Sequence, residues 1–379
     1  MNMMNNMDVT RKAGLYLHVP FCVQKCAYCD FASWAGREHL MADYARALIG
    51  EMADAPKAGV SVRTVYIGGG TPSLFPPEWM DKVLSCMEAH FPIDGDAEKS
   101  CEMNPGTVTE AFLQVLKKHR FNRVSMGMQA GQDRLLALLG RVHRAKDVES
   151  SVALLKSAGF TNFNLDIMLG LPGQTLEDVR ETLDLALSLQ PTHLSCYGLI
   201  VEEGTRMHRM VETGAWQLPP VETEREMYEL CRNLLEQHGF RQYEISNFAL
   251  PGFECRHNVD TWRRGEYYGI GCAACGFMED IRYQNPPVLE DYLAGKAREE
   301  TVITKEDAVF ESVMLGLRLT DGIREEDFVN MHGLTFRDAF ADKLQKPIRN
   351  GLLIYENGVL KLTRRGMDVQ NSVLVDLMD

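Results

Sequence analysis

Three cysteines fall within eight residues in the stretch Cys22-Val-Gln-Lys-Cys26-Ala-Tyr-Cys29. The apolar run from Gly14 to Pro20 just before them has the composition of a strand bounded by a turn. A loop after a strand can direct three thiolates toward one region, and thiolates are ligands for zinc or for iron–sulfur clusters. Both usually take four protein ligands, yet Pro20 and the extended backbone argue against His18 as the fourth. An iron with an open position binds a substrate or cosubstrate instead.

The Cys-x-x-x-Cys-x-aromatic-Cys spacing resembles the signature of radical S-adenosylmethionine (SAM) proteins, in which a [4Fe–4S] cluster binds SAM through its unique iron. The strings Leu15-Tyr-Leu-His-Val-Pro-Phe-Cys22 and Tyr28-Cys29-Asp30-Phe31 resemble one branch of them. That branch contains oxygen-independent coproporphyrinogen III dehydrogenase and a related family of heme chaperones. The alternative is a zinc knuckle with a remote fourth ligand, because closely spaced cysteines are commonly metal sites of either kind.

The resemblance implies a SAM pocket built from several parts of the chain. Gly68-Gly-Gly-Thr-Pro72 follows an expected strand at Val62–Ile67 and lets the backbone approach a ligand closely, where the family receives the SAM amino group. Glu102 and Asp166 lie near strand ends, where buried carboxylates need polar partners. The structural alternatives are a tight turn at the glycines, and an arginine or a helix N-terminus beside each carboxylate. The implied SAM-binding set is Tyr16, Tyr28, Gly69, Gly70, Thr71, Glu102, Gln129, Arg141 and Asp166.

A repeating order of strand, loop and helix predicts the fold. Helices are expected over Leu40–Met52 and from Pro77, and capping boxes are expected at Thr107-Val-Thr-Glu110 and Thr175-Leu-Glu-Asp178. This order implies an α/β fold of parallel strands with right-handed crossovers, as in a barrel or part of one. Chemistry then gathers at the C-terminal ends of the strands. The family resemblance makes this a partial (β/α)6 radical SAM barrel. The expected strand ends are near Glu102, Met128, Met168 and Tyr197.

The repeating order stops near Phe248. Residues 255–262 and 267–275 are rich in glycine and aromatic residues, and we predict loops there that close one end of the barrel. Two amphipathic helices, Asp307–Leu319 and Phe336–Leu344, then precede a hairpin that turns at Asn357-Gly358. This pattern predicts a small C-terminal α+β domain that is winged-helix-like. The expected divisions are a barrel over residues 1–250, a connecting segment with the heme loop over 251–303, and the C-terminal domain over 304–379.

The segment Arg256-His257-Asn258, with Trp262 after it, separates the members of the branch. Histidine is a common axial ligand of heme iron, and aromatic rings give a porphyrin a flat apolar surface. Heme chaperones of this branch carry a similar Arg-His-Asn-x-x-Tyr-Trp pattern, so the resemblance implies heme binding at His257. Thr261 stands where the pattern has tyrosine, which removes the contacts of that ring. The alternative is an ordinary surface or core histidine.

A second departure from the family concerns Gly269-Ile-Gly-Cys-Ala-Ala-Cys275-Gly276, where the family usually has Gly-x-Gly-Ala-x-Ala-His-Ser. Cys272 and Cys275 could form a redox pair or complete a metal site, since Cys-x-x-Cys is competent for both. We predict instead that both are small packing residues. The same role is expected for Cys86, Cys101, Cys196, Cys231 and Cys255.

Composition and charge indicate which partners and which cellular compartment to expect. The 379 residues carry a net charge of −13, which would repel nucleic acid, and the pairs Arg263-Arg264 and Arg364-Arg365 are expected to be solvated surface. No transmembrane segment is expected, because no apolar run has the length that a bilayer requires. The N-terminus lacks a signal-peptide pattern, and ten cysteines without one predict reduced thiols in the cytoplasm.

These observations predict a heme chaperone that binds heme and a SAM-ligated [4Fe–4S] cluster and delivers heme to acceptor proteins. The alternative is the coproporphyrinogen III dehydrogenase, which decarboxylates a porphyrin precursor oxidatively. That enzyme carries a longer N-terminal extension, whereas fifteen residues precede Tyr16 here, and this favours the chaperone. A third class, a zinc-structured interaction protein, would bind no SAM. The sequence leaves open the heme acceptor, SAM cleavage, peripheral contact with a membrane and the oligomeric state.

Overall fold

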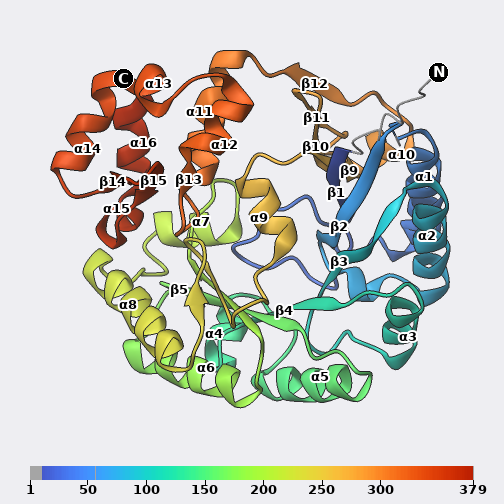
Figure 1. Ribbon diagram of the computed structural model, residues 1–379. Helices are drawn as coiled ribbons and strands as arrows, with labels where there is room; N and C mark the ends of the chain where they lie inside the picture. The colour runs from blue at the N-terminus through green and yellow to red at the C-terminus, as the bar shows by residue number, and fades with distance from the viewer. Residues whose placement is uncertain (1–10, 56, 379) are drawn as a thin grey trace, which may run out of the picture.

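The computed structural model describes residues 11–55 and 57–378. Residues 1–10, in which no signal peptide is expected, lie outside this part of the chain, as do residues 56 and 379. The described residues form a twelve-stranded sheet in the order β12-β11-β10-β9-β1-β2-β3-β4-β5-β6-β8-β7 and a three-stranded sheet in the order β13-β15-β14. Figure 1 shows the larger sheet curving around the centre of the molecule, with helices on its outer side.

Six neighbouring strands of the larger sheet are parallel and follow one another along the chain. They are β1 (Arg11–Val19), β2 (Val60–Gly69), β3 (Ile93–Met103), β4 (Arg123–Gln129), β5 (Phe163–Leu169) and β6 (His193–Gly198). The helices of this region are α1 (Met41–Asp54), α2 (Pro77–His90), α3 (Glu110–Lys118), α4 (Asp133–Leu138), α5 (Ala145–Ser157), α6 (Leu176–Ser188), α7 (Arg206–Glu212) and α8 (Val221–Gln237). This order confirms the predicted α/β fold. The barrel is partial, because β12 and β7 lie at opposite ends of the sheet.

The sheet continues beyond residue 248, so the loops predicted there are wrong. Strand β9 (Tyr267–Ile270) pairs in parallel with β1, and residues 256–262 form the short helix α9 (Arg256–Trp262). The strand is only four residues long and contains Gly269, so its local pattern is weak, and pairing with β1 rather than propensity makes it a strand. The further elements here are β7 (Arg241–Gln242), β8 (Asn247–Ala249), β10 (Cys275–Met278), β11 (Ile281–Gln284), α10 (Leu289–Leu293) and β12 (Glu299–Val302).

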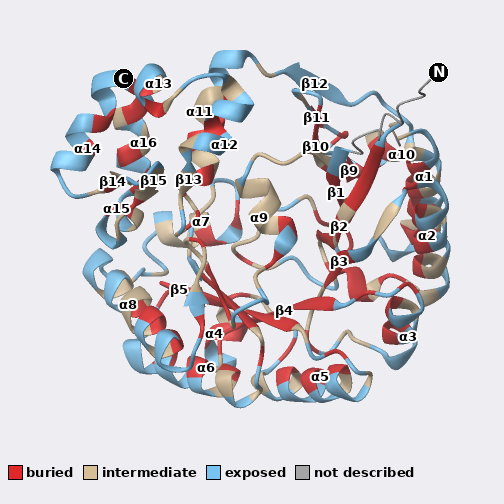
Figure 2. Cartoon of the chain, in the orientation of Figure 1, coloured by how far each residue is buried: buried red, intermediate tan, exposed pale blue. Residues whose placement is uncertain are grey.

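Side-chain alternation along β1 divides the core from the interior of the barrel. Leu15 and Leu17 are buried in one apolar cluster with Leu48 of α1. Tyr16 and His18 point the other way and line a cavity inside the barrel. Figure 2 shows the same division, with buried residues along the strands and on the sides of α1 and α2 that face the sheet. The polar side chains of β1 are therefore directed to the site and its apolar ones to the core.

The C-terminal elements pack around an apolar cluster of their own, which includes Val313, Phe328 and Leu360. The predicted hairpin is confirmed, since Asn357 and Gly358 both have positive φ, as a two-residue turn of this kind requires. The second predicted helix is shorter than expected, because the chain leaves helical geometry after Phe340. The elements are α11 (Lys305–Gly316), β13 (Ile323–Arg324), α12 (Glu325–His332), α13 (Phe336–Phe340), α14 (Gln345–Arg349), β14 (Leu353–Glu356), β15 (Val359–Leu362), α15 (Arg364–Asp368) and α16 (Gln370–Met378).

One of the two predicted capping boxes is present. Thr175 caps α6, and its side chain and that of Asp178 each accept a hydrogen bond from the other's backbone N–H. The box predicted at Thr107 is wrong, because α3 begins at Glu110 and its cap is Thr109, whose hydroxyl accepts from Phe112 N at 3.2 Å. A threonine two residues later takes the role because the intervening chain forms a turn first.

We expect Thr175→Ala to lower the free energy of unfolding by about 1 kcal/mol, since the backbone N–H of Asp178 loses its acceptor. Urea denaturation of the purified protein measures this loss. The control is Thr301→Ala on the exposed strand β12, which is expected to change stability by less than about 0.5 kcal/mol. Equal effects of the two substitutions would contradict the assigned cap.

The two arginine pairs differ in burial, so the surface prediction is wrong for one residue. The Arg264 side chain is only 7% exposed, and its Nε donates to Glu311 Oε2 of α11 at 3.2 Å. This contact fastens the end of α9 to the C-terminal elements. Arg364 is exposed and pairs with Glu236 on the surface, as expected. None of the helices in the described ranges is long and apolar enough to cross a membrane.

Candidate cofactor site

The cysteine loop follows β1 and is fastened to the segment after α4, where Gln24 Nε2 donates to Gly140 O at 3.1 Å. Cys22, Cys26 and Cys29 all line one cavity of about 370 Å³. Burial raises the pKa of the Cys22 and Cys29 thiols, so these two stay protonated at neutral pH until a metal displaces the proton. The predicted triplet therefore opens into a single space.

The arrangement of the thiols favours a cluster over a single ion. Between residues 11 and 378, with residue 56 left aside, no three histidine, cysteine or carboxylate side chains lie close enough to share one metal ion. A zinc knuckle needs four ligands around one ion, whereas a [4Fe–4S] cluster takes each cysteine at a different iron. His18 is engaged at both ring nitrogens, with the Tyr16 hydroxyl at 2.9 Å and Ala32 O at 2.8 Å. It is therefore not poised as a fourth ligand.

The cavity beside the cysteines brings together most of the predicted SAM-binding set. The members of that set that line it are Tyr28, Gly69, Gly70, Glu102, Gln129, Arg141 and Asp166. Three other predicted site residues do not line it. The Thr71 hydroxyl lies 3.7 Å from Cys22 Sγ, and Tyr16 and His257 line an adjoining cavity.

Glu102 projects from the end of β3 and is held in place by two donors. Its Oε1 accepts from the Tyr66 hydroxyl at 2.9 Å, and its Oε2 accepts from Gly69 N at 3.1 Å. Burial, together with the charge of Asp166, raises the pKa of Glu102 to about 7. Its ionised form is thus poorly solvated, and a ligand that brings positive charge or further donors stabilises it.

Asp166 lies in the middle of β5 and faces the same cavity. Its Oδ1 accepts from Asn164 Nδ2 at 2.7 Å, and burial raises its pKa. Among the described residues, neither Asp166 nor Glu102 has the direct pairing with an arginine that a purely structural role would predict; their bonded partners are amide, hydroxyl and backbone groups. Two carboxylates without a cationic partner therefore border one cavity.

Arg141 supplies the positive charge at the opposite side. Its Nη2 donates to Asn104 Oδ1 at 2.6 Å and to Gly127 O at 2.9 Å, and its Nη1 lies 3.6 Å from Cys26 Sγ. Asn104 also donates to Thr71 Oγ1 at 2.7 Å, so it connects the arginine to the glycine loop. The sequence-based set missed Asn104, although its place two residues after Glu102, at the same strand end, was a signal. Other lining residues that the set missed are Tyr66, Ser125, Met168 and Tyr197.

Gly69 occupies a conformation that few other residues adopt. Its φ is +112°, and a Cβ at this position would lie 2.5 Å from the ring of His18. The glycine lets β1 and β2 approach closely at their ends, where both cavities begin. The close backbone approach expected at this motif is thus present, although the nearest crowded group is a histidine ring.

A second cavity of about 720 Å³ adjoins the first and shares Phe31, Ser33, Gly69 and Glu102 with it. This volume is within the usual range of ligand sites. Its further lining includes Tyr16, His18, His257, Thr261, Tyr267 and Cys275.

His257 is buried at the start of α9 and is held in a fixed orientation. Its Nδ1 lies 3.0 Å from Thr64 Oγ1, and its ring stacks on Tyr66 with centroids 5.2 Å apart. Burial, with the charge of Arg123, lowers its pKa to about 4, so the imidazole is neutral at physiological pH. A neutral ring that donates from Nδ1 leaves the Nε2 lone pair for a metal.

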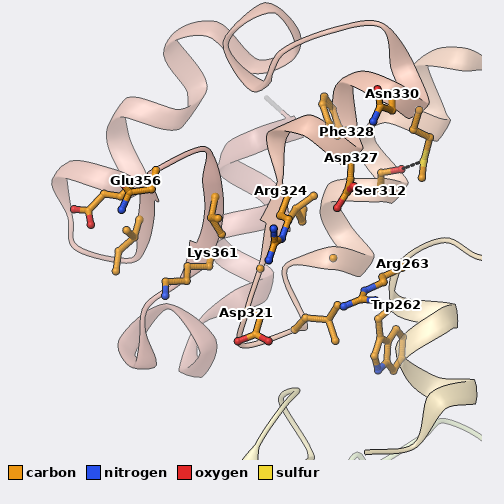
Figure 3. A pocket seen from close by; sticks show the side chains of 18 residues that line it. Trp262, Arg263, Ser312, Asp321, Arg324, Asp327, Phe328, Asn330, Glu356 and Lys361 are labelled. Carbon is orange, nitrogen blue, oxygen red and sulfur yellow. Dashed lines mark hydrogen bonds between the residues drawn. The ribbon is translucent and has the colours of Figure 1, made fainter.

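Trp262 does not share that cavity with His257. It lines a third cavity, of about 1150 Å³, between the end of α9 and the C-terminal elements (Figure 3). The guanidinium of Arg318 lies 4.2 Å from the centre of its ring. Figure 3 shows charged side chains of both signs around this space, among them Arg324 and Asp321. The predicted histidine and tryptophan therefore face different spaces, because they occupy opposite ends of one short helix.

The two cysteines after β9 also differ. Cys272 is fully buried, and its thiol donates to Pro286 O at 3.2 Å, in agreement with a packing role. Cys275 is partly exposed and lines the cavity of His257, which a packing role does not explain. Cys101, Cys196, Cys231 and Cys255 are buried.

Comparison with known proteins agrees with this architecture. The model of the radical SAM superfamily matches residues 16–186, and that of the HemN C-terminal domain matches residues 303–369. The fold superposes on coproporphyrinogen III oxidase (HemN) of Escherichia coli with a TM-score of 0.85 at 24% identity, over 98% of this chain and 91% of the other. The class is thus that of radical SAM proteins, whose cofactors are a [4Fe–4S] cluster and SAM.

Relatives that are similar over most of both chains identify the family within the radical SAM proteins. The chain is 36% identical to the heme chaperone HemW of Bacillus subtilis, over 94% of this chain and 97% of the relative. It is 34% identical to that of Lactococcus lactis, over 94% and 95%. With HemW of Synechocystis it shares 38% identity over 84% and 81%. The chain therefore belongs to the HemW family of radical SAM proteins.

Proposed function

We propose that this protein is a heme chaperone that holds a SAM-ligated [4Fe–4S] cluster, binds heme beside it and delivers the heme to acceptor proteins. The proposal is supported by the names of its relatives. The observation that carries it is His257, a neutral and oriented imidazole that borders a cavity of about 720 Å³ next to the SAM cavity. Such an imidazole is suited to be an axial ligand of heme iron.

In this proposal the residues of the first cavity hold the cluster and SAM. Cys22, Cys26 and Cys29 would hold the cluster, which would supply an iron position at which SAM can bind. Glu102 and Asp166 accept hydrogen bonds from the amino and hydroxyl groups of SAM, and Arg141 holds its carboxylate. The fit rests on two carboxylates without cationic partners and one arginine around about 370 Å³ of space.

The residues of the second cavity hold the porphyrin. A hydrogen bond between Thr64 Oγ1 and His257 Nδ1 fixes the orientation of the imidazole, and Tyr66 stacks on one face of its ring. Thr261 is on the wall of this cavity and supplies no aromatic surface. We infer that the heme is held less firmly than it would be with tyrosine there, which suits a protein that releases its cargo.

A second function, oxidative decarboxylation of coproporphyrinogen III, is favoured by one observation. Gly69 and Glu102 border both cavities, so a porphyrinogen in the second cavity would lie beside SAM in the first. Radical chemistry requires that proximity, whereas a chaperone does not. Turnover of coproporphyrinogen with SAM and an electron donor, without uptake of heme, would favour this alternative.

The setting in which the protein acts is part of the proposal. The described cysteines are all free thiols, and an oxygen-sensitive cluster needs a reducing compartment, so we place the protein in the cytoplasm. The acceptors are proteins that take up heme. Peripheral contact with a membrane, where many heme proteins reside, and self-association are outcomes to be tested by fractionation and by light scattering.

His257→Ala is expected to lower heme affinity at least about tenfold, since the iron loses its imidazole ligand. Titration of the anaerobically reconstituted protein with heme, followed by the Soret absorbance, measures this. The control is His90→Ala on the outer helix α2, which is expected to bind heme as the unchanged protein does. Equal binding by His257→Ala would remove this residue from the site, and no heme uptake by the unchanged protein would overturn the proposed function.

A further inference from the structure

We infer that Cys275 would supply a second protein ligand to the heme iron, a thiolate, in addition to His257. This inference rests on the proposed function and deepens it by naming the iron's ligands. Both side chains line the same cavity of about 720 Å³, and they approach it from different elements, α9 and the start of β10. Thiolate sulfur and imidazole nitrogen are both common ligands of heme iron.

The position of Cys275 follows from the close packing of two backbones. A Cβ on Gly269 would lie 1.8 Å from the carbonyl oxygen of Cys275, so the loop after β9 folds back over that strand. Gly269 pairs with Tyr16 of β1, which lines the cavity. Only a glycine fits beneath the backbone of Cys275 at position 269. The Cys275 thiol is therefore held at the wall of the cavity and not in the core between the sheet and the helices.

His257 stands over the neighbouring part of the same two strands. Its Cε1 and the Cβ of Tyr267 each lie 3.2 Å from where a Cβ of Gly14 would be, and Gly14 pairs with Tyr267. His257 thus lies over Tyr267 and Cys275 lies over Gly269, two residues further along β9. Two residues of a strand span about 7 Å, a distance that two side chains can bridge to one atom.

The thiol of Cys275 is available for coordination. No hydrogen bond to it is found within the described ranges, whereas the thiol of the nearby Cys272 is used by Pro286 O. Burial raises the pKa of Cys275, so the free protein carries the thiol form. On binding, the sulfur–hydrogen bond breaks, a sulfur–iron bond forms, the proton leaves to solvent, and the oxidation state of iron does not change.

His257 offers a nitrogen as a second donor to the cavity that Cys275 lines. About nine-tenths of its surface is buried, its Nδ1 is bound to Thr64, and Nε2 has no partner in the part of the chain that the structure describes. This nitrogen keeps some solvent exposure, and because His257 lines the cavity, a metal bound there can reach the Nε2 lone pair. The cysteine and the histidine thus offer two unused donors to one space.

The test is the spectrum of bound heme. With imidazole and thiolate both bound, the ferric heme is low-spin, and its EPR signal is shifted to a narrower spread of g values than that of a heme with two imidazole ligands. Cys275→Ser is expected to remove this shift, to raise the reduction potential of the heme and to weaken heme binding at least about tenfold, because the electron-rich thiolate stabilises ferric iron. Cys275→His is expected to give the spectrum of heme with two imidazole ligands.

The matched control is Cys272→Ala in the same loop, which is expected to leave the heme spectrum unchanged because its thiol is directed at Pro286. Iron–sulfur content reports whether each variant is folded. Iodoacetamide labelling is a second measurement on the unchanged protein: heme is expected to protect Cys275 and not Cys86 of α2.

The outcomes separate this inference from the proposed function. Heme uptake with a histidine-type spectrum that Cys275→Ser does not alter, or labelling of Cys275 that heme does not slow, overturns the thiolate ligand and leaves the chaperone intact. Failure of the unchanged protein to take up heme overturns both. A shifted spectrum that only Cys275 substitutions abolish establishes the ligand.

Discussion

Replacing Cys22, Cys26 or Cys29 by serine is expected to abolish the brown absorbance of the reconstituted [4Fe–4S] cluster, because serine oxygen is a harder and poorer ligand for this iron than thiolate sulfur. In the proposed cluster each cysteine would bind a separate iron, so the loss of any one would leave a second iron without a protein ligand. Absorbance spectra and iron and sulfide analysis after anaerobic reconstitution measure the loss. SAM binding is expected to disappear with the cluster, since its iron contact is gone.

The controls come from cysteines outside the triplet. Cys272→Ser and Cys275→Ser are expected to keep the cluster at full iron and sulfide content, because neither residue lines the cavity of the triplet. Loss of cluster in either of these would show that the second pair contributes a ligand. Retention of a colourless single metal ion by the triplet variants would favour zinc.

SAM affinity is expected to rise with pH through about 7, the pH at which the buried Glu102 ionises. Only the carboxylate form can accept hydrogen bonds at both oxygens from the donors of this cationic cofactor. Glu102→Gln is expected to remove the pH dependence and to weaken binding about ten- to a hundredfold at pH 8, since a bond to a charged group contributes roughly 1.5–3 kcal/mol. Calorimetry of the cluster-loaded protein between pH 6 and pH 8.5 measures both effects.

Ionisation of Glu102 favours SAM binding, but it lowers the stability of the cofactor-free protein. Its pKa is about 7 in the folded chain and 4.5 when unfolded, so the folded state binds more protons between these values. The free energy of unfolding of the cofactor-free protein therefore falls as pH rises through this window, by up to about 3 kcal/mol. Glu102→Gln is expected to flatten that slope, and Glu78→Gln, at an exposed position in the first turn of α2, is the control. An unchanged slope and unchanged SAM binding in Glu102→Gln would remove this residue from the pocket.

Stability and cofactor binding are thus opposed at the first cavity. Glu102 and Asp166 are both partly buried, and their loss of solvation raises the pKa of each. A cationic ligand stabilises their ionised forms, so binding is coupled to the release of protons. This explains physically why two carboxylates that pair with no described lysine or arginine persist near the end of β3 and within β5, where an apolar residue would give a more stable apoprotein.

The sequence by itself determined the parts of this protein that depend on local chemistry. The Cys22–Cys29 spacing predicts a cluster because three thiols in one short loop share a region whatever surrounds them. The regular order of strands and helices up to Phe248 predicts parallel strands, and the parallel pairing of β3, β4 and β5 brings Glu102 and Asp166 to one cavity.

Only the tertiary structure decided what depends on distant partners. Four residues at β9 become a strand because β1 offers them an edge, and no local pattern reveals that pairing. His257 and Trp262 are close in sequence, yet they face different cavities because the short helix α9 turns them apart. Cys275 reaches the cavity of His257 because the chain folds back over Gly269. The sequence shows which metal-binding and polar side chains the chain contains, and long-range packing determines which of them line the same cavity.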